Sequence, residues 1–179
     1  MNSCDQKAKV KVFPFFILFF VFSAGCGGYH FASDSNNLPG EITSISIPFF
    51  QNETYEANIE SYFTRALINE FIKNKKFTIL SQGGDATLYG IVKNFHATTI
   101  AYSAQDKVLE YRAAVTLDLT LKNNHTGETI WRKPSLISEE EYKVSSEDIA
   151  LTEATKKVAF QKIATELATQ IYEELVLGF

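Results

Sequence analysis

The sequence predicts an α+β fold, a two-layer sandwich with two helices on one face of a mixed parallel and antiparallel sheet of four to five strands. Apolar residues recur at helical spacing in two segments, one before and one after a long central region. The central region instead alternates apolar and polar residues, as strands with one buried face do. Helices and sheet each have an apolar side to bury, and packing them together satisfies both.

The first predicted strand covers residues 42–50, ITSISIPFF. Ile45, Ile47 and Phe49 alternate with polar or small positions, which predicts that these three apolar side chains share the buried face. Pro48 cannot donate a backbone hydrogen bond, so it belongs at the end of the strand or on a sheet edge.

A loop over residues 51–55 leads into the first predicted helix, of about four turns. Its apolar face consists of Ile59, Phe63, Leu67 and Phe71. Lys73, Lys75 and Lys76 end the helix, where cations suit the negative end of the helix dipole. These lysines have two interpretations, a phosphate-binding patch or an ordinary solvated helix end.

Residues 77–80 are the second predicted strand, and a helical connection between two strands predicts that they run parallel. After the turn at 81–85, residues 86–102 and 109–122 form the two long strands of a hairpin. Residues 128–132 return as a short strand. The alternation in 109–122 is unbroken, so one side of this strand faces the core and the other faces solvent.

Helical spacing returns from Ser145, which with Asp148 forms a predicted capping pair. The apolar stripe of this C-terminal helix consists of Phe160, Ala164, Leu167, Ile171 and Leu175. The run Glu139 to Glu141, upstream of the helix, is interpreted as a solvated loop because three adjacent carboxylates cannot converge on one metal ion from a regular element.

The N-terminus predicts three parts: residues 1–25 as a lipoprotein signal peptide, 26–40 as a lipidated N-terminus and tether, and 41–179 as a single periplasmic domain. Three lysines precede an apolar run of 13 residues, which is shorter than the roughly 20 that a membrane helix needs. The run ends in the lipobox-like SAGC, so Cys26 is the candidate lipid-attachment residue. Ser23 stands where a branched aliphatic residue is usual, and ordinary cleavage that leaves Cys26 as a free thiol is the alternative.

Composition and motif content argue against several function classes. Removing residues 1–25 leaves 14 basic and 20 acidic side chains, a net charge of about −6 that argues against a nucleic-acid binder. Cys4 and Cys26 are the only cysteines, so neither a disulfide nor a cysteine-bound zinc can hold the body of the protein. The histidines are scattered, and the sequence contains neither a phosphate-binding glycine loop nor a nucleophile elbow. We therefore expect no enzyme activity, no cofactor and no metal.

A set of short motifs, in order along the chain, resembles the LptE family of lipopolysaccharide-assembly lipoproteins. The motifs run from Cys26 to the last helix, and they are GYHF at 28–31, LPG at 38–40, ISIPFFQNETY at 45–55, TRAL at 64–67, ATLYG at 86–90, EYR at 110–112 and GETIW at 127–131. The resemblance implies an outer-membrane lipoprotein on the periplasmic side, with two helices on a mixed sheet. It implies a place inside the LptD β-barrel translocon, contact with lipopolysaccharide and no catalysis. Gly27, which follows the cysteine in place of the inner-membrane retention aspartate, also favours the outer membrane.

Arg112 and Lys93 are the candidate contacts to lipopolysaccharide or to the barrel. Strand alternation places Arg112 on the polar sheet face, opposite the helices. A cross-strand salt bridge with a neighbouring acid is the alternative role for Arg112. The alternative function for the whole chain is that of another envelope lipoprotein, similar to the amino-terminal domain of TolB or to penicillin-binding-protein activators, that docks on and regulates a partner.

Overall fold

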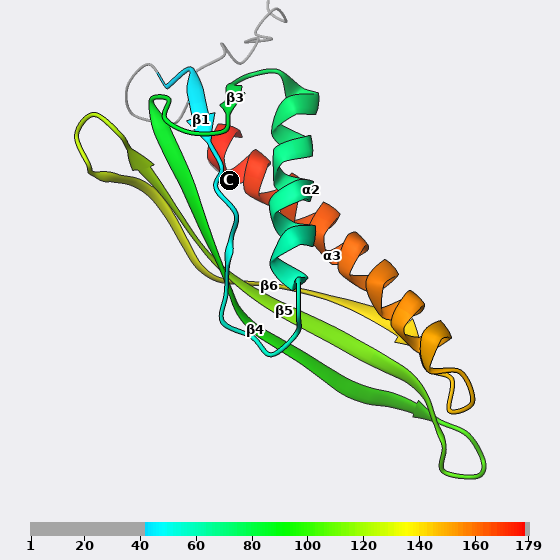
Figure 1. The fold of residues 1–179 in the computed structure, drawn as a ribbon. Helices are drawn as coiled ribbons and strands as arrows, with labels where there is room; N and C mark the ends of the chain where they lie inside the picture. The colour runs from blue at the N-terminus through cyan, green and yellow to red at the C-terminus, as the bar shows by residue number, and fades with distance from the viewer. Residues whose placement is uncertain (1–41, 178–179) are drawn as a thin grey trace, which may run out of the picture. The chain divides into compact units, whose positions relative to one another are not determined.

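The computed structural model describes residues 42–177, and within them it forms two helices and one sheet. Both helices lie on the same side of the sheet (Figure 1), which confirms the predicted two-layer α+β fold. The elements in chain order are β1 (Ser44–Ser46), β2 (Gln51–Asn52), α2 (Ile59–Asn74), β3 (Thr78–Leu80), β4 (Ala86–Tyr102), β5 (Val108–Asn123), β6 (Thr129–Lys143) and α3 (Ile149–Leu177).

The six-stranded sheet has the order β3-β1-β4-β5-β6, with β2 paired to β4 outside that path. Strand β1 pairs in parallel with both β3 and β4, whereas β5 runs antiparallel to β4 and to β6. The predicted parallel pairing of the strands on either side of α2 is therefore confirmed. Strand β4 joins the two halves of the sheet. One edge of β4 pairs in parallel with β1 and β2, and the other edge pairs antiparallel with β5.

The prediction for the first strand is wrong in its second half. Phe49 is 63% exposed, and the buried aromatic residue is Phe50, which is 4% exposed. From the last residue of β1 to the first of β2 the chain takes five steps, whereas their partners on β4 are four residues apart. The extra residue shifts the alternation after β1 by one position, so that Phe50 and not Phe49 faces the helices. Two residues that were expected in a loop, Gln51 and Asn52, form β2.

The last strand is longer than predicted, because β6 continues past Pro134 to Lys143. Ser135 adopts a left-handed backbone (φ 54°), and its N–H donates to Asp118 Oδ1 at 2.8 Å, so the strand crosses the proline as an irregularity and then resumes. The expected loop at Glu139 to Glu141 is therefore a strand. Glu140 points toward α3 and pairs with Lys162 at 2.5 Å.

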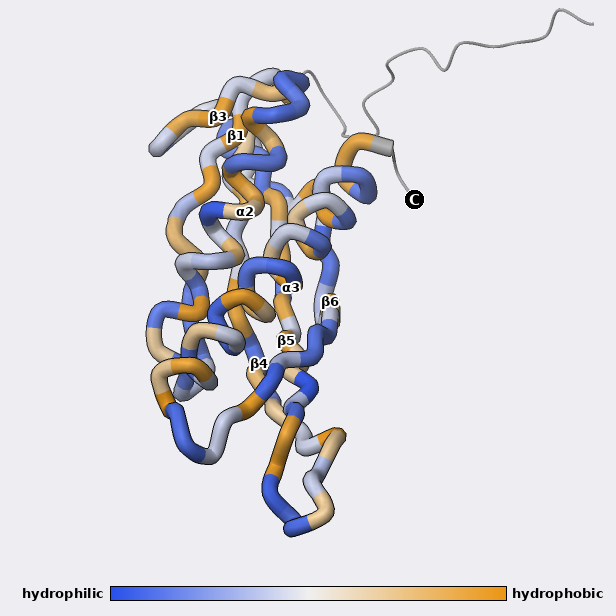
Figure 2. Tube along the Cα trace, turned by 90° about the vertical axis from the view of Figure 1, so that its right-hand side faces the viewer, coloured by the Kyte–Doolittle hydropathy of each residue, from blue (hydrophilic) through white to orange (hydrophobic). Residues whose placement is uncertain are grey.

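The core lies between the sheet and two helices that run in the same direction. Tyr62 contacts Phe160 (5.7 Å between ring centroids), and further along both helices Phe71 contacts Tyr172 (5.2 Å). Figure 2 shows hydrophobic and hydrophilic positions alternating along both helices, as amphipathic helices require. The predicted helix stripes are confirmed, since each of these side chains is at most 2% exposed: Ile59, Phe63, Leu67, Phe71, Phe160, Ala164, Leu167, Ile171 and Leu175.

The start of α3 uses both members of the predicted capping pair in a shifted arrangement. Ser145 Oγ accepts the N–H of Asp148 at 3.0 Å, as expected. The helix, however, begins at Ile149, and Asp148 Oδ1 accepts the N–H of Leu151 at 2.9 Å. Asp148 is therefore the N-cap residue, and Ser145 orders the chain before it.

The segment between β1 and α2 is fixed by a close contact between Phe50 and Gly90 of β4. A Cβ atom on Gly90 would lie 2.4 Å from the Phe50 ring, so only glycine leaves room for this ring. Thr64 of α2 holds the same segment from the other side. Its Oγ1 accepts the Phe50 N–H at 3.1 Å and donates to the carbonyl oxygen of Glu60 at 2.8 Å.

We expect Gly90→Ala to lower the free energy of unfolding by about 1–3 kcal/mol, because the added methyl group overpacks the site against the ring of Phe50. Urea denaturation of the two proteins measures the difference. In a double-mutant cycle with Phe50→Leu, the smaller side chain should relieve about 1 kcal/mol of the Gly90→Ala cost. Strict additivity of the two substitutions would contradict the contact.

Candidate functional site

Arg112 lies on the sheet face away from the helices, where the structure holds it in a cross-strand ion pair. It faces Glu141 in the β5–β6 register, with Nη2 2.8 Å from Oε1, and its Nε lies 3.9 Å from Glu139 Oε2. The hydrogen bond and charge of Glu141, followed by the charge of Glu139, raise the pKa of Arg112. The salt-bridge alternative therefore describes the geometry of Arg112 in this structure.

Lys93 lies on β4 and forms an ion pair with Glu53, just after β2. The hydrogen bond and charge of Glu53 raise the pKa of Lys93, and Asp118 adds a smaller effect. The β4 residue that pairs with Arg112 is Thr98, five positions beyond Lys93. The two candidate residues thus occupy separate places on the sheet and do not form one pocket.

Small side chains lie along β5 on this outer sheet face. Ala114, Thr116 and Thr120 on β5 are half-buried although no helix covers them. Larger apolar side chains are exposed on this face as well, among them Tyr89 at 47%, Tyr102 at 61% and Ile137 at 56%. Such a face, with small side chains on β5 and with Arg112 and Lys93 held in ion pairs, is suited to contact over a broad area with another surface.

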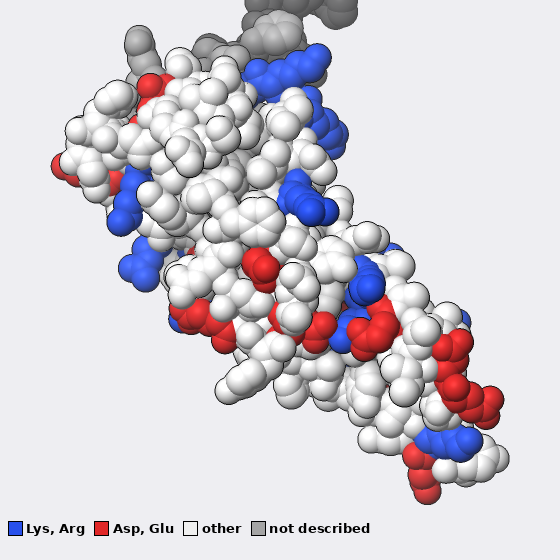
Figure 3. Space-filling view, in the orientation of Figure 1, with Lys and Arg blue, Asp and Glu red and all other residues white. Residues whose placement is uncertain are grey.

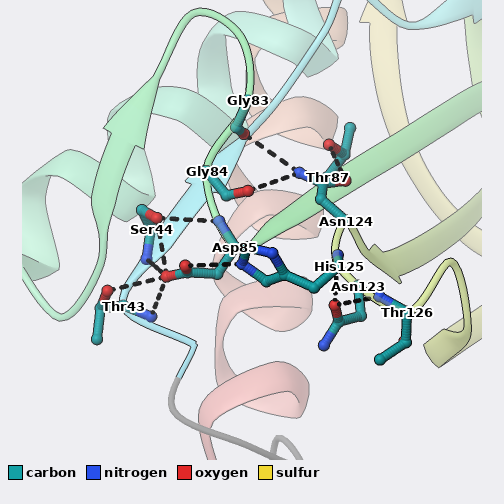
Figure 4. Close-up of polar contacts among 10 residues, drawn as sticks. All are labelled: Thr43, Ser44, Gly83, Gly84, Asp85, Thr87, Asn123, Asn124, His125 and Thr126. Atoms are coloured by element: carbon teal, nitrogen blue, oxygen red, sulfur yellow. Dashed lines mark hydrogen bonds and ion pairs between the residues drawn. The ribbon is translucent and has the colours of Figure 1, made fainter.

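A cluster of polar contacts ties three segments of the chain together at the end of the sheet where β1 begins (Figure 4). Asp85 Oδ2 accepts the N–H and the hydroxyl of both Thr43 and Ser44, at 2.8–2.9 Å. Its Oδ1 lies 3.5 Å from His125 Nε2. The hydrogen bonds from Thr43 and Ser44, led by the Thr43 N–H, hold the pKa of Asp85 far below its usual range.

Asn124, in the β5–β6 turn, extends this cluster across β4. Its backbone N–H donates to the Asp85 carbonyl oxygen at 2.8 Å, and its side-chain amide donates to Gly84 O at 2.9 Å. Thr87 donates to Asn124 Oδ1 at 2.9 Å and is hydrogen bonded to buried Ser46 at 2.8 Å. The sequence predicted turns at Asp85 and Asn124 and strands at Ser46 and Thr87. It did not indicate that they meet, because the contacts join residues about forty positions apart.

Asn52 organises the connection into α2. Its Oδ1 accepts both the N–H and the hydroxyl of Thr54, at 2.9 and 2.8 Å, and its Nδ2 donates to Glu56 O and Glu60 Oε2 at 2.8 and 3.0 Å. Lys156 of α3 then binds the Glu56 carboxylate at 2.9 Å. The motif NET that carries part of the family resemblance therefore shapes a connecting loop and docks it on the second helix.

Residues 42–177 contain no group of three or more His, Cys, Asp or Glu side chains arranged to hold a metal ion. Over the same range, no helix is long and apolar enough to cross a membrane. A groove of about 460 Å³ lies at the surface where α2 meets α3 and is lined mainly by polar residues, among them Arg65 and Gln161. Cys26, the candidate lipid-attachment residue, lies outside the described residues.

The fold is shared with solved structures of bacterial lipoproteins. Rare lipoprotein B from Shewanella oneidensis superposes with a TM-score of 0.51 at 12% identity, covering 74% of this chain and 95% of that one. A minor lipoprotein from Acinetobacter baumannii gives a TM-score of 0.50 at 11% identity, covering 78% of this chain and 95% of that one. Among curated proteins, no sequence matches this chain.

Residues 42–175 match the LptE family, described as lipopolysaccharide-assembly. The match spans most of the chain, and the chain belongs to this family. The resemblance inferred from the ordered motifs is thereby confirmed.

We expect Asp85→Asn to destabilise the protein at neutral pH. In acid, the stability of this variant should change less with pH than that of the wild type. A carboxylate whose folded pKa is lowered stabilises the fold above its ordinary pKa of 3.8, and this stabilisation is lost as the pH falls below that value. Wild-type protein should therefore lose stability more steeply than Asp85→Asn below about pH 4.

Urea denaturation at a series of pH values measures this difference. Asp106→Asn is the matched control, because Asp106 is exposed in the β4–β5 turn and its left-handed backbone also suits asparagine. Equal acid sensitivity of wild type and Asp85→Asn would show that the Asp85 contacts do not stabilise the fold.

Proposed function

We propose that this protein is an outer-membrane lipoprotein that assembles with an LptD-type β-barrel, occupies its lumen and helps deliver lipopolysaccharide to the cell surface. Membership of the lipopolysaccharide-assembly family over residues 42–175 is the observation that carries the proposal. The role is non-catalytic: the protein acts by binding a barrel and a lipid rather than by chemistry.

The N-terminal sequence supports the place of the protein in the cell. A signal-like apolar run that ends at Cys26 provides a thiol for lipid attachment, and two or more acyl chains anchor a protein stably where one does not. Lipidation at Cys26 would hold the domain at the periplasmic face of the outer membrane. The solved relatives of the same fold are themselves described as lipoproteins, which agrees with this arrangement.

The described surface supports a role in assembly. The outer face of β4 to β6 presents small side chains with exposed Tyr89 and Ile137, and its charged residues Arg112 and Lys93 are held in place by acidic partners. An ordered surface of this kind loses little side-chain entropy when it meets the wall of a barrel. Arg112 and Lys93 can also exchange their carboxylate partners for phosphate groups of lipopolysaccharide, since arginine binds phosphate in the same geometry as a carboxylate.

The proposal is tested by photocrosslinking in cells with an encoded crosslinker at Ile137, on the outer sheet face. We expect a heat-modifiable outer-membrane barrel of the LptD type in the crosslinked product. Cys26→Ser should lower the yield because the anchor is lost, whereas Cys4→Ser, which changes a cysteine inside the predicted signal peptide, should not. A peptidoglycan synthase in place of the barrel would contradict the proposal and support a regulatory lipoprotein.

Arg112→Ala and Lys93→Ala together should weaken binding to lipopolysaccharide and leave the fold intact. Both side chains are exposed, and their ion pairs are screened by solvent, so we expect little change in the melting temperature. Binding of labelled lipopolysaccharide and circular dichroism measure the two effects. Lys107→Ala with Lys157→Ala is the matched control for lost positive charge. Equal binding by both double variants would remove Arg112 and Lys93 as contacts.

A further inference from the structure

The chain enters the described domain directly beside the end of α2. Thr78 donates its N–H to the carbonyl oxygen of Thr43 at 2.8 Å, and Ser44 pairs with Thr78 in the parallel β1–β3 ladder. Lys75 and Lys76 come three and two residues before Thr78, so the end of α2 leads directly to the place where the described chain begins. Cys26 precedes Ile42 by sixteen residues, a length of chain that reaches at most about 55 Å when extended.

The same end of the domain carries exposed apolar side chains on either side of these lysines. Ile72, in the last turn of α2, is 56% exposed, and Leu80, at the end of the edge strand β3, is 37% exposed. No described element covers either side chain.

Positive charge lies beside Ile72 at the end of α2. The Lys73 side chain is 73% exposed and pairs with the nearby Glu70 at 3.4 Å. Lys75 ends the helix in a left-handed conformation (φ 56°), with its N–H donating to Phe71 O at 3.2 Å, at a position where glycine or asparagine is usual. Figure 3 shows basic side chains, and no acidic ones, over the upper right of the molecule where α2 ends.

We propose that this end of the domain, defined by Ile72, Lys73, Lys75 and Leu80, docks on the surface of a bilayer that contains anionic phospholipid. The apolar side chains enter the interface, and the lysines bind lipid phosphates from its edge. The proposal rests on the lipid anchor at Cys26, which keeps the domain within reach of the membrane. Docking then sets the orientation of the tethered domain before it meets the barrel, which a tether alone would leave free.

The test uses the mature lipidated protein reconstituted in phosphatidylcholine vesicles with or without phosphatidylglycerol, both carrying a dansyl headgroup probe. Trp131 is the only tryptophan in the chain and pairs with Leu121 close to the β5–β6 turn, which itself contacts Asp85 at this end of the sheet. We expect stronger energy transfer from Trp131 to the probe when phosphatidylglycerol is present, and a decrease on adding salt.

Lys73→Glu with Lys75→Glu should reduce the transfer to the level seen in phosphatidylcholine alone. The matched control is Lys107→Glu with Lys157→Glu, which makes the same charge change at exposed positions away from this end and should leave the transfer unchanged. Ile72→Ser should also reduce the transfer, whereas Leu151→Ser, which changes another exposed apolar side chain, should not. Transfer that is insensitive to phosphatidylglycerol and to both lysines would overturn the docking proposal.

Flotation of the same vesicles separates this result from a failure of the anchor. Lipidated protein floats with pure phosphatidylcholine vesicles whether or not the domain docks, so flotation without lysine-dependent transfer overturns docking alone. If Cys26 is unmodified, the protein does not float with those vesicles and the anchor proposal fails. In that case binding to added phosphatidylglycerol vesicles still tests docking, and we expect the lysine reversal to weaken it by at least about tenfold. Unchanged binding would overturn docking.

Discussion

The contact between the Phe50 ring and Gly90 fixes how the first third of the domain joins the long antiparallel strands. A single extra residue between β1 and β2 turns Phe50 toward the helices, and the missing side chain at Gly90 makes room for its ring. Thr64 then binds the backbone of Phe50, which sets where α2 lies on the sheet. The parallel pair of helices follows from this placement, because α3 packs along α2 through aromatic contacts. A shift of one residue in this connection would expose Phe50 and remove the anchor point of α2.

The sequence predicted the elements whose burial is local in origin and missed those set by distant partners. Both helix stripes and the apolar face of β5 could be predicted because one continuous face of each meets the core. The burial of Phe50 in place of Phe49 could not be predicted, because it depends on how β1 and β2 align with β4. The second half of β6 was not predicted, because Pro134 and three consecutive glutamates are unusual within a strand. Their charges are tolerated in the strand because Arg112 and Lys162 face them from β5 and α3.

The same distinction applies to the functional residues. The motifs that identify the family contain several residues with structural roles in this chain. Asn52 shapes the loop before α2, Thr64 accepts the N–H of Phe50, and Gly90 leaves room for the Phe50 ring. Arg112 could be placed on the outer face from alternation alone, but its partner Glu141 lay in a segment expected to be a loop. The polar cluster at Asp85 gave no signal in the sequence, since it forms only when three distant segments meet. Surfaces available for partners are therefore found among exposed residues, including Arg112 and Lys93, whose ion pairs are open to solvent.

The central claim is that this protein supports the delivery of lipopolysaccharide to the cell surface, and depletion of the protein tests it most directly. We expect surface lipopolysaccharide, measured by labelling of intact cells, to fall as the protein is depleted and to recover when the wild-type chain is supplied. Total lipopolysaccharide in the cell should fall less than the surface fraction, because assembly fails after synthesis. Unchanged surface lipopolysaccharide in fully depleted cells would contradict the claim.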